Sequence, residues 1–377
     1  MSAKKRYFLF NFSKTFFGFS IAWKRRYITP FINHKNENVL LFCSSLQEAI
    51  AKNLNSNDTI YIWGRKNEAE VYEYAKANNI KICIVEDGFI RSVSLGSDLT
   101  RPFSLVIDTQ GIYFDPSTPS DLEKILAEQT FDDSLKERAK SLILTIVKTK
   151  FSKYNGIEHK KIELDANAKG KKIILVPGQV EDDASILLGA YGQNTLDLLS
   201  QARESCKDAY IIYKPHPDVL SGNRKGLKDS SVALRYCDLV IENYSIDSCI
   251  EVCDEVHTLT SLSGFDALLR GKKVFVYGMP FYAGWGLTKD KLNNERRNRE
   301  LTLEELVAAT LLLYPRYIHP KTLQPCQAEE MLSEMIKMQQ HYFNSKYYKF
   351  IYDIKRFLIR KIRRTIEYVL KKRGKEC

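Results

Sequence analysis

The chain has 377 residues and a mass of 43.6 kDa, a length that suits two domains of roughly 150 residues better than one. Hydrophobic residues make up 44%, aromatic residues 11% and charged residues 27%, which is a globular composition and excludes disorder as the main state. The 18 glycines and 11 prolines are too few for a fibrous or low-complexity protein.

The net charge of +11 is concentrated at the two ends of the chain. Residues 1–35 contain eight Lys/Arg and no acidic residue, residues 341–377 contain 12 Lys/Arg and three acidic residues, and residues 36–340 carry a net charge of −6. Basic ends on a mildly acidic body indicate contact with an anionic surface, and they argue against a nucleic-acid partner. The eight scattered cysteines lack the spacing of paired zinc ligands and are typical of a reducing cytoplasm.

The most apolar early stretch covers residues 7–23, and Asn11, Ser13 and Lys14 interrupt it. It is therefore too short to cross a membrane. A small-residue cleavage site is missing and basic residues follow directly, so we expect a basic, aromatic surface segment over 1–35 rather than a signal peptide.

Strand-like apolar runs and helical patterns alternate in two series. The alternation predicts an α/β fold with parallel, doubly wound sheets in two domains, 36–155 and 171–326, joined by a polar connection at 155–170. The first series has strands expected at 39–43, 59–63, 80–85, 105–107 and 112–114, and helices at 46–52, 68–78 and 121–127. The second has strands expected at 172–176, 210–213, 239–242, 255–258 and 274–277, and helices at 195–203 and 265–270.

C-terminal helices with a basic amphipathic tail are expected over 327–377. Apolar residues recur there at steps of three and four, and Lys and Arg occupy the other faces; the apolar positions are Ile351, Ile354, Leu358, Ile362, Ile366 and Val369. Such a stripe either packs on the body of the protein or lies on an anionic membrane surface.

Four polar groups follow predicted strands, at the carboxyl ends where doubly wound sheets bind ligands. The first group contains three carboxylates and two guanidinium groups close together in the sequence. These residues are Glu86, Asp87, Arg91, Asp98 and Arg101. A guanidinium group holds a carboxylate through two parallel hydrogen bonds, so this group predicts a pocket for a polar substrate. The alternative is a network of ion pairs within the loop.

The second group is the acidic run after the strand at 172–176, made up of Gln179, Glu181, Asp182, Asp183 and Ser185. Adjacent carboxylates repel one another, so a function or nearby cations must compensate. One of them at the mouth of a sheet is suited to act as nucleophile or base on a sugar carbon. The alternative is a negatively charged helix N-terminus that the helix dipole stabilises.

The third and fourth groups are suited to a phosphate. Prolines on both sides fix the backbone of His216, next to Lys214, and this pair can bind a phosphate or protonate it as it leaves. Ser261, Ser263 and Gly264 open a predicted helix whose free N–H groups attract an anion, although serine is also a common helix cap.

Two further features concern the donor. The aromatic, glycine-rich loop at 280–287 is expected to stack on a base or a sugar. The chain contains no D-x-D pair, the pair that holds a divalent metal in many nucleotide-diphosphate sugar transferases. We therefore expect no metal and no other cofactor, with a donor activated by a monophosphate.

Six motifs together carry a resemblance to a known family. They are EDGFIRSVSLGSDLTRPFSLVIDTQGIYFDPSTPSDLE (86–123), VPGQVEDDAS (176–185), KPHP (214–217), TSLSGFDALLRGK (260–272), YGMPFYAGWGLT (277–288) and YPRYIHP (314–320). The chain resembles the KpsC-type β-Kdo glycosyltransferases of bacterial capsule synthesis. The motifs run in the order found in that family.

The resemblance implies two Rossmann-like domains in a GT-B-like arrangement, and metal-free transfer of Kdo from CMP-Kdo with retention of the β configuration. It implies Asp183 as covalent nucleophile, with Glu181 and Asp182 at the variable positions beside it, and His216 as partner of the CMP phosphate. Gln179, Ser185, Lys214, Ser261, Ser263 and Gly264 would complete the donor site. Residues of the 86–101 loop would receive a lipid-linked or glycan acceptor.

The enzymes of the family usually carry two such modules, and this chain has one, so we expect it to make one kind of linkage. It would work in the cytoplasm, on the inner face of the inner membrane, alone or with other capsule or lipopolysaccharide assembly proteins. Two alternatives remain: a non-catalytic capsule assembly or export protein, and a transferase that uses another CMP-sugar such as CMP-sialic acid.

Overall fold

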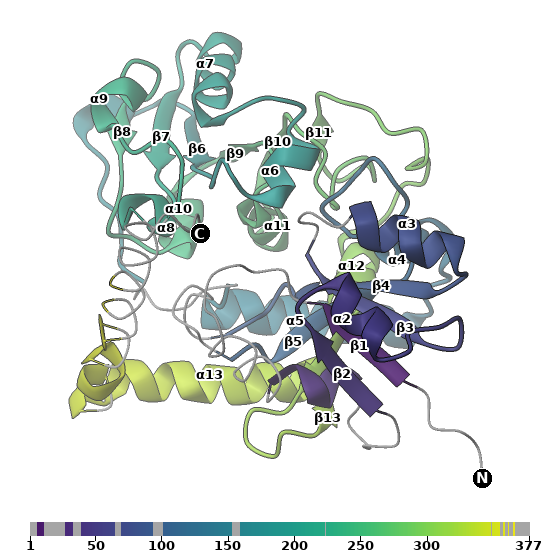
Figure 1. Ribbon diagram of the computed structural model, residues 1–377. Coiled ribbons are helices and arrows are strands. Elements are labelled where there is room, and N and C mark those ends of the chain that lie inside the picture. The colour runs from purple at the N-terminus through teal and green to yellow at the C-terminus, as the bar shows by residue number, and fades with distance from the viewer. Residues whose placement is uncertain are drawn as a thin grey trace. The chain divides into compact units, whose positions relative to one another are not determined.

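The computed structural model of the chain describes residues 6–10, 27–32, 39–64, 69–92, 101–152, 159–222, 224–347, 349–354, 357–358, 361 and 365. Its contacts divide it into two compact units. Unit 1 consists of Met1–Thr109 and Pro315–Cys377, and unit 2 is the continuous segment Gln110–Tyr314. Each unit is an α/β structure built around one sheet (Figure 1).

The described strands of unit 1 form one mixed sheet in the order β13-β12-β5-β4-β3-β1-β2. The strands β2, β1, β3 and β4 are parallel to one another, whereas β5 pairs antiparallel with β4 and β12, and β13 pairs antiparallel with β12. Their bounds are β1 Arg6–Phe10, β2 Val39–Cys43, β3 Thr59–Trp63, β4 Lys81–Asp87, β5 Ser104–Asp108, β12 Pro315–Ile318 and β13 Pro325–Cys326. The expected parallel sheet is thus wrong at one edge, where two strands come from the distant C-terminal part of the chain.

Residues 6–10 are a strand of the sheet interior, so the expectation of a surface segment is wrong for them. β1 lies between β2 and β3, with Tyr7 opposite both Leu40 and Thr59. Phe8 and Leu9 are 0% and 1% exposed, because alternate side chains of a strand point into the two layers that cover it. Apart from the helical residues 27–32, the rest of 1–35 lies outside the described residues.

Helices cover both faces of the unit 1 sheet. On one face, α2 (Leu46–Ala51) and α3 (Ala69–Ala77) pack on Phe8, Ile60 and Ile62. On the other, residues 27–32 pack on Leu9 and Tyr61. The long helix α13 (Ala328–Asn344) contacts β12.

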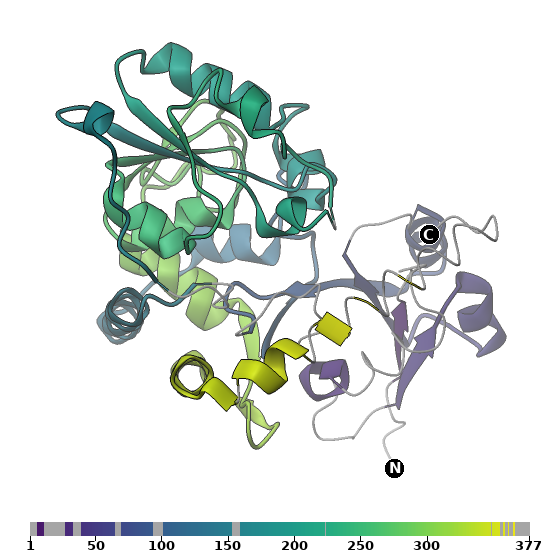
Figure 2. The same ribbon diagram turned by 90° about the vertical axis from the view of Figure 1, so that its left-hand side faces the viewer.

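The sheet of unit 2 is parallel throughout the described residues, as the sequence predicts. Its order is β11-β10-β9-β6-β7-β8. The strands are β6 Ile173–Pro177, β7 Tyr210–Lys214, β8 Leu239–Val240, β9 Glu255–Thr258, β10 Lys273–Val276 and β11 Lys289–Asp290. Such a sheet is covered by helices on both faces, and Figures 1 and 2 show this arrangement.

The helices of unit 2 fall into two sets around the sheet. Buried residues of α6 (Ala184–Gly189), α7 (Thr195–Ser205) and α9 (Ser230–Ala233) share one core with β6 and β7. α10 (Ile246–Val252) contacts β6, and α11 (Leu262–Leu269) contacts β9 and β10.

A separate group of helices in unit 2 was only partly expected from the sequence. α4 (Asp121–Glu128) matches the predicted helix, and α5 (Asp133–Thr149), α12 (Leu303–Val307) and the π-helical η3 (Ala308–Leu313) pack near it. Residues 112–114, expected as a strand, are not in one. The short α8 (Pro217–Leu220) and the 3-10 turn η2 (Ala166–Ala168) complete the unit.

The boundary between the units differs from the expected connection at 155–170. Residues 110–155 belong to unit 2, because α4 and α5 pack on η3 of that unit. Residues 315–326 belong to unit 1, because β12 pairs with β5.

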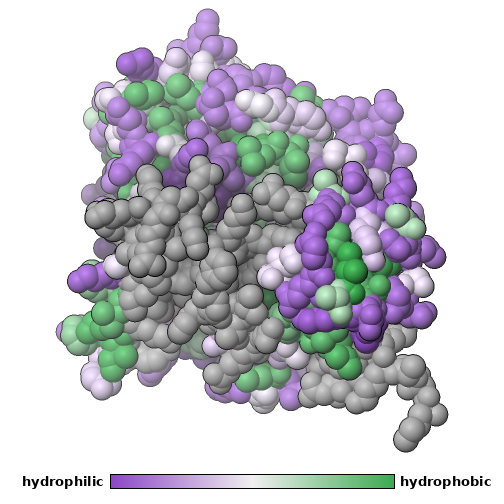
Figure 3. Space-filling model, viewed as in Figure 1, coloured by the Kyte–Doolittle hydropathy of each residue, from purple (hydrophilic) through white to green (hydrophobic). Residues whose placement is uncertain are grey.

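The viewed surface of the described residues is largely hydrophilic, with hydrophobic patches between the polar side chains (Figure 3). Among these residues, no helix has both the length and the apolar character needed to cross a membrane.

Candidate functional site

The predicted donor residues gather at one edge of the unit 2 sheet. The strands β9, β6 and β7 are parallel neighbours, so their carboxyl ends meet at this edge. The second, third and fourth polar groups follow these three ends directly. The N–H of Gly178, after β6, donates to the carbonyl of Lys214, at the end of β7, over 2.7 Å.

Gln179 joins two of these loops. Its side chain is 7% exposed, and its Nε2 donates to Thr260 Oγ1 at 2.9 Å while its Oε1 accepts from the Thr260 N–H at 3.1 Å. The amide of Gln179 therefore holds the loop after β6 against the loop after β9.

Asp183 begins helix α6 as its N-cap. Its Oδ1 accepts from the N–H of Ser185 at 3.1 Å and from the Ser185 hydroxyl at 2.8 Å. This pattern satisfies one of the N–H groups that a helix start leaves without partners. The side chain of Asp183 remains 47% exposed, so its second oxygen is accessible to a ligand.

Arg224 lies against the acidic run, and sequence reasoning missed it. Its Nε donates to Asp182 Oδ1 at 3.0 Å, and its Nη2 lies 3.7 Å from Asp183 Oδ2. The guanidinium group offsets the repulsion between the two carboxylates. Arg224 stands in a polar loop, about 40 residues from the acids that it pairs with, and nothing local in the sequence marks it.

The ring of His216 is fixed as the N-cap of α8. Its Nδ1 accepts from the N–H of Asp218 at 3.1 Å, so the neutral ring carries its proton on Nε2. Burial lowers the pKa of His216 below its usual value; Asp218 and Asp183 partly oppose this effect, and Arg224 adds to it. The side chain is thus a neutral N–H donor at the edge of the sheet.

Lys214 is buried at the end of β7, with 5% of the residue exposed. Burial lowers the pKa of its ammonium group, and its Nζ donates to the carbonyl of Glu242 at 3.4 Å. The Lys214 amino group thus lies buried at the carboxyl end of β7.

The start of α11 is a tight turn built on serine and glycine. Ser261 Oγ accepts from the N–H of Ser263 at 3.1 Å, and Tyr282 Oη donates to the Ser261 carbonyl at 2.5 Å. A Cβ atom on Gly264 would clash with that Oη. Glycine is therefore required where the helix crosses Tyr282.

The expected stacking role of the loop at 280–287 is wrong for its largest side chains. Tyr282 and Trp285 are each 0% exposed, and Phe281 is 6% exposed. Trp285 Nε1 donates to the carbonyl of Phe281 at 2.9 Å. These rings form part of the core that supports α11, so no face is available to a base or a sugar.

The first polar group belongs to unit 1. Glu86 and Asp87 end β4, and Arg91, 3% exposed, donates from Nε to Asp87 Oδ2 at 2.5 Å and from Nη1 to Ser92 Oγ at 3.0 Å. The guanidinium group of Arg101 lies 4.8 Å from the ring centre of Tyr27. The fifth predicted residue, Asp98, lies outside the described residues.

The described residues include two groups of side chains that could hold a metal ion, and neither contains a predicted donor residue. In the group of His159, Asp247 and Glu251, existing partners neutralise the acids: Arg270 Nε donates to Asp247 at 2.6 Å, and Lys150 Nζ lies 3.4 Å from Glu251. The other group consists of Glu255 and His257 on β9 and Cys206 at the end of α7.

Comparison with known proteins places the chain among capsule proteins. Residues 58–317 match the family described as "Capsule polysaccharide biosynthesis protein". The capsule polysaccharide modification protein LipA of Neisseria meningitidis serogroup A is 48% identical over 318 residues, which cover 84% of this chain and 44% of LipA. The lipopolysaccharide-processing protein LpsZ of Rhizobium meliloti is 42% identical over 258 residues, 68% of this chain and 58% of LpsZ. The chain thus spans less than half the length of LipA.

Two solved structures share the fold. The β-Kdo 2,7 transferase of Thermosulfurimonas dismutans KpsC is 38% identical, with a TM-score of 0.70, over 89% of this chain and 100% of that one. The β-Kdo 2,4 transferase of the same KpsC is 31% identical, with a TM-score of 0.72, over 87% and 97% of the two chains.

Proposed function

The chain belongs to the family of capsule polysaccharide biosynthesis proteins, and from this premise we propose that it is a retaining glycosyltransferase that transfers Kdo from CMP-Kdo with β linkage. The observation that carries the proposal is the cluster of Asp183, Arg224, His216 and Lys214 at the carboxyl edge of the unit 2 sheet. The similarity to two Kdo transferases supports the choice of sugar.

The reaction first requires a site that stabilises the departing CMP. The C2–O bond of the donor breaks, and the phosphate leaves with an additional negative charge. His216 offers an Nε2–H donor, Ser263 lies in the first turn of α11, and Lys214 and Arg224 supply positive charge. Fixed donors and charges aimed at a developing anion stabilise the transition state without a metal ion, so we propose that the donor site uses none.

The nucleophile is the second requirement. Ser185 occupies Oδ1 of Asp183, so we propose that Oδ2 forms the bond to C2 of Kdo as CMP leaves. An acceptor hydroxyl then displaces Asp183 and gives its proton to a base, and the two inversions together retain the configuration. The guanidinium group of Arg224, 3.7 Å from Oδ2, offsets the repulsion between Asp183 and the carboxylate of Kdo.

The acceptor is assigned to unit 1. We propose that the two units act as the Rossmann-like domains of a GT-B transferase, and that Glu86, Asp87, Arg91 and Arg101 line the acceptor side. Because Arg91 is buried against Asp87, its role there is to fix the loop. The acceptor is a capsule or lipopolysaccharide glycan or glycolipid.

The location follows from the C-terminal tail. Five large apolar residues after helix α13 are 42% to 63% exposed: Phe350, Ile351, Ile354, Phe357 and Leu358. Residues 341–377 also contain 12 Lys/Arg. We propose that the tail lies on the anionic cytoplasmic face of the inner membrane.

Mass spectrometry of the protein mixed with CMP-Kdo, without acceptor, tests the function. The wild type should gain one Kdo on a peptide that contains Asp183. Asp183→Asn keeps a side chain able to cap α6, and it should remove the adduct and lower transfer roughly 10³-fold or more. Asp182→Asn is the matched control, because it also touches Arg224, and it should keep the adduct.

Parallel incubations separate the alternatives. An adduct or turnover with CMP-sialic acid and none with CMP-Kdo would assign another donor. A protein that binds neither nucleotide sugar would be a non-catalytic assembly protein. An active Asp183→Asn variant would show that another carboxylate is the nucleophile.

A further inference from the structure

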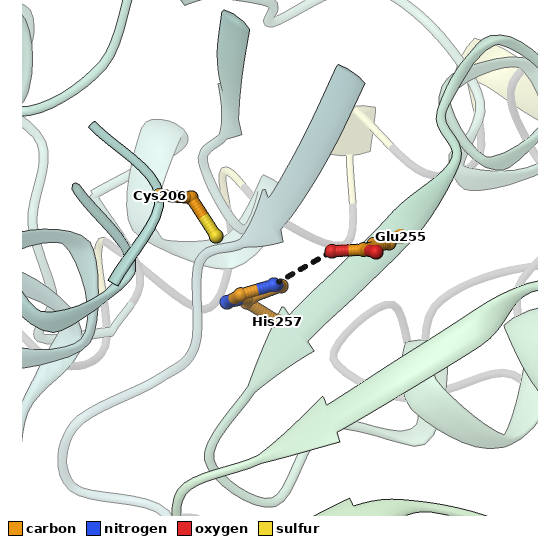
Figure 4. A group of neighbouring side chains, drawn as sticks. All are labelled: Cys206, Glu255 and His257. Atoms are coloured by element: carbon orange, nitrogen blue, oxygen red, sulfur yellow. Dashed lines mark ion pairs between the residues drawn. The ribbon is translucent and has the colours of Figure 1, made fainter. Parts of the chain in front are cut away.

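Three side chains with metal-binding atoms meet on one face of the unit 2 sheet, at β9 (Figure 4). Glu255 and His257 belong to β9 two residues apart, so they point to the same face, and Cys206 follows the end of α7. One ligand atom from each residue lies within 4.8 Å of those of the other two. The residues come from different elements, so the fold rather than a local repeat brings them together.

Two polar atoms of this group are buried without a hydrogen-bond partner. They are Glu255 Oε2 and His257 Nε2, in residues that are 3% and 1% exposed. Their separation of 3.6 Å is too long for a hydrogen bond. An unpaired polar atom in the protein interior destabilises the fold, and both atoms point toward the same place.

Neighbouring residues fix this orientation. Lys172 Nζ lies 3.0 Å from Glu255 Oε1, which leaves Oε2 to face His257. His257 Nδ1 lies 3.0 Å from Tyr277 Oη, and the ring stacks on Phe275 at 4.6 Å between centres. When Nδ1–H donates to Tyr277, Nε2 carries the lone pair and lies 3.6 Å from Glu255 Oε2, which is the tautomer of a histidine that ligates a metal through Nε2.

We propose that Cys206, Glu255 and His257 bind one Zn²⁺ ion, which joins the end of α7 to β9. A thiolate, an imidazole and a carboxylate are the ligands that zinc takes in proteins. In a tetrahedral site these atoms lie about 3.3 to 3.8 Å apart, within the 4.8 Å that bounds their separations here. Cys206 ends its helix and is half-buried, so its side chain can turn, and water can supply the fourth ligand.

This site is separate from the proposed donor site. Glu255 starts β9, three residues before Thr258, whose hydroxyl faces Gln179 at 3.4 Å. Three residues of strand span about 10 Å, and residues 255 and 257 face the side of the sheet opposite to 258. The ion therefore stabilises unit 2 and takes no part in transfer.

Metal analysis and thermal unfolding of the full chain test the proposal. Wild type loaded with ZnCl2 and dialysed against metal-free buffer should retain about one zinc per chain. ZnCl2 should raise Tm by about 5 °C, the shift expected for an ion present at about 100 times its Kd. Cys206→Ser and His257→Gln should lose the zinc and the shift. Cys326→Ser, at another half-buried free cysteine in unit 1, should keep both.

The absorption spectrum of the protein with Co²⁺ bound in place of Zn²⁺ gives a second measurement, which does not depend on the stability of the protein. The wild type and Cys326→Ser should show a thiolate-to-Co²⁺ absorption band, and Cys206→Ser should lack it. Zinc bound equally by wild type and Cys206→Ser would overturn the proposal, and so would a wild type that binds no zinc and whose Tm ZnCl2 leaves unchanged. These measurements involve no nucleotide sugar. Failure of the zinc proposal can therefore be distinguished from failure of the proposed transfer reaction.

Discussion

Arg224 forms ion pairs with two of the three adjacent acids, Asp182 and Asp183, and Asp183 is the proposed nucleophile. Its ion pairs are partly exposed, so they add at most about 1 kcal/mol to stability. In the proposed reaction, however, the same charge faces a donor that carries a carboxylate and a phosphate. The importance of Arg224 should therefore be greater for donor binding than for folding.

Arg224→Gln should raise the KM for CMP-Kdo about 10- to 100-fold, with a change of less than about 1 kcal/mol in the free energy of unfolding. Steady-state kinetics and urea denaturation measure the two effects. Arg235→Gln, at an exposed arginine of the same unit, should change neither. An unchanged KM in Arg224→Gln would remove this residue from the donor site.

His216 should titrate below the usual histidine range. Burial lowers its pKa from 6.5, so the ring should stay neutral at pH 7 and take up a proton only as the pH falls below 6.5. NMR of isotope-labelled histidine, with the signal assigned by its loss in His216→Gln, measures the midpoint. Because the unfolded chain binds this proton first, the contribution of His216 to stability is full above pH 6.5 and is lost as the pH falls through the lowered pKa. A midpoint at or above 6.5 would contradict the buried, neutral donor.

A buried ion pair joins helix α4 to the loop that contains Arg296 and Arg297. Glu123 accepts from Arg296 Nε at 2.6 Å and from Arg297 Nε at 3.1 Å. Arg297 is 7% exposed and also donates to the carbonyls of Pro280 and Ala283, at 2.6 and 2.8 Å. This guanidinium group thus joins α4 to the loop that supports α11.

Glu123→Gln should lower the free energy of unfolding by about 3 to 5 kcal/mol, because it leaves the charge of Arg297 buried without an anion. Chemical denaturation followed by circular dichroism measures the loss. Glu128→Gln, at the exposed end of the same helix, is the control and should cost less than about 0.5 kcal/mol. The double variant Glu123→Leu/Arg297→Met should be more stable than Glu123→Gln, and the reverse order would argue against a buried charge as the cause.

Some elements were predictable because their pattern is local. The strands at Val39–Cys43, Thr59–Trp63 and Glu255–Thr258 have the predicted bounds. The first two are short, largely apolar runs between polar residues. β1 was missed because Arg6–Phe10 is followed by more aromatic residues and flanked by basic ones, which suggested a surface. The pairing of β12 with β5 joins residues about 210 apart, and no local pattern encodes it.

The candidate site was likewise predictable only in part. The sequence predicted the carboxyl edge of the second sheet and the residues on it, because loops after parallel strands meet there. It did not reveal Arg224, whose partners depend on the path of a loop. Nor did it show that Trp285 and Tyr282 are buried, since aromatic, glycine-rich loops occur both in binding sites and in cores.

At the scale of the molecule, the tail should govern location. Truncation after Ser345 keeps helix α13, which ends at Asn344, and removes the exposed apolar residues and all 12 Lys/Arg of residues 341–377. Binding to vesicles of anionic phospholipid should weaken at least about tenfold, and binding of the full chain should weaken in high salt, because exposed charges are screened. Vesicle co-sedimentation measures both effects.

The truncated protein should keep its Tm within a few degrees and its transfer to a soluble acceptor. Equal binding of the two forms to vesicles would show that the tail is not the anchor. A large loss of Tm would show instead that the tail packs on the body.

Unit 1 is made from both ends of the chain, while unit 2 is continuous, and this has a consequence for synthesis on the ribosome. β5 leaves the ribosome with its outer edge unpaired, because β12 follows about 200 residues later. At about 5 to 20 residues per second, that delay lasts roughly 10 to 40 s. During this time unit 2 can complete its own sheet, and the unpaired edge of β5 is open to intermolecular strand pairing.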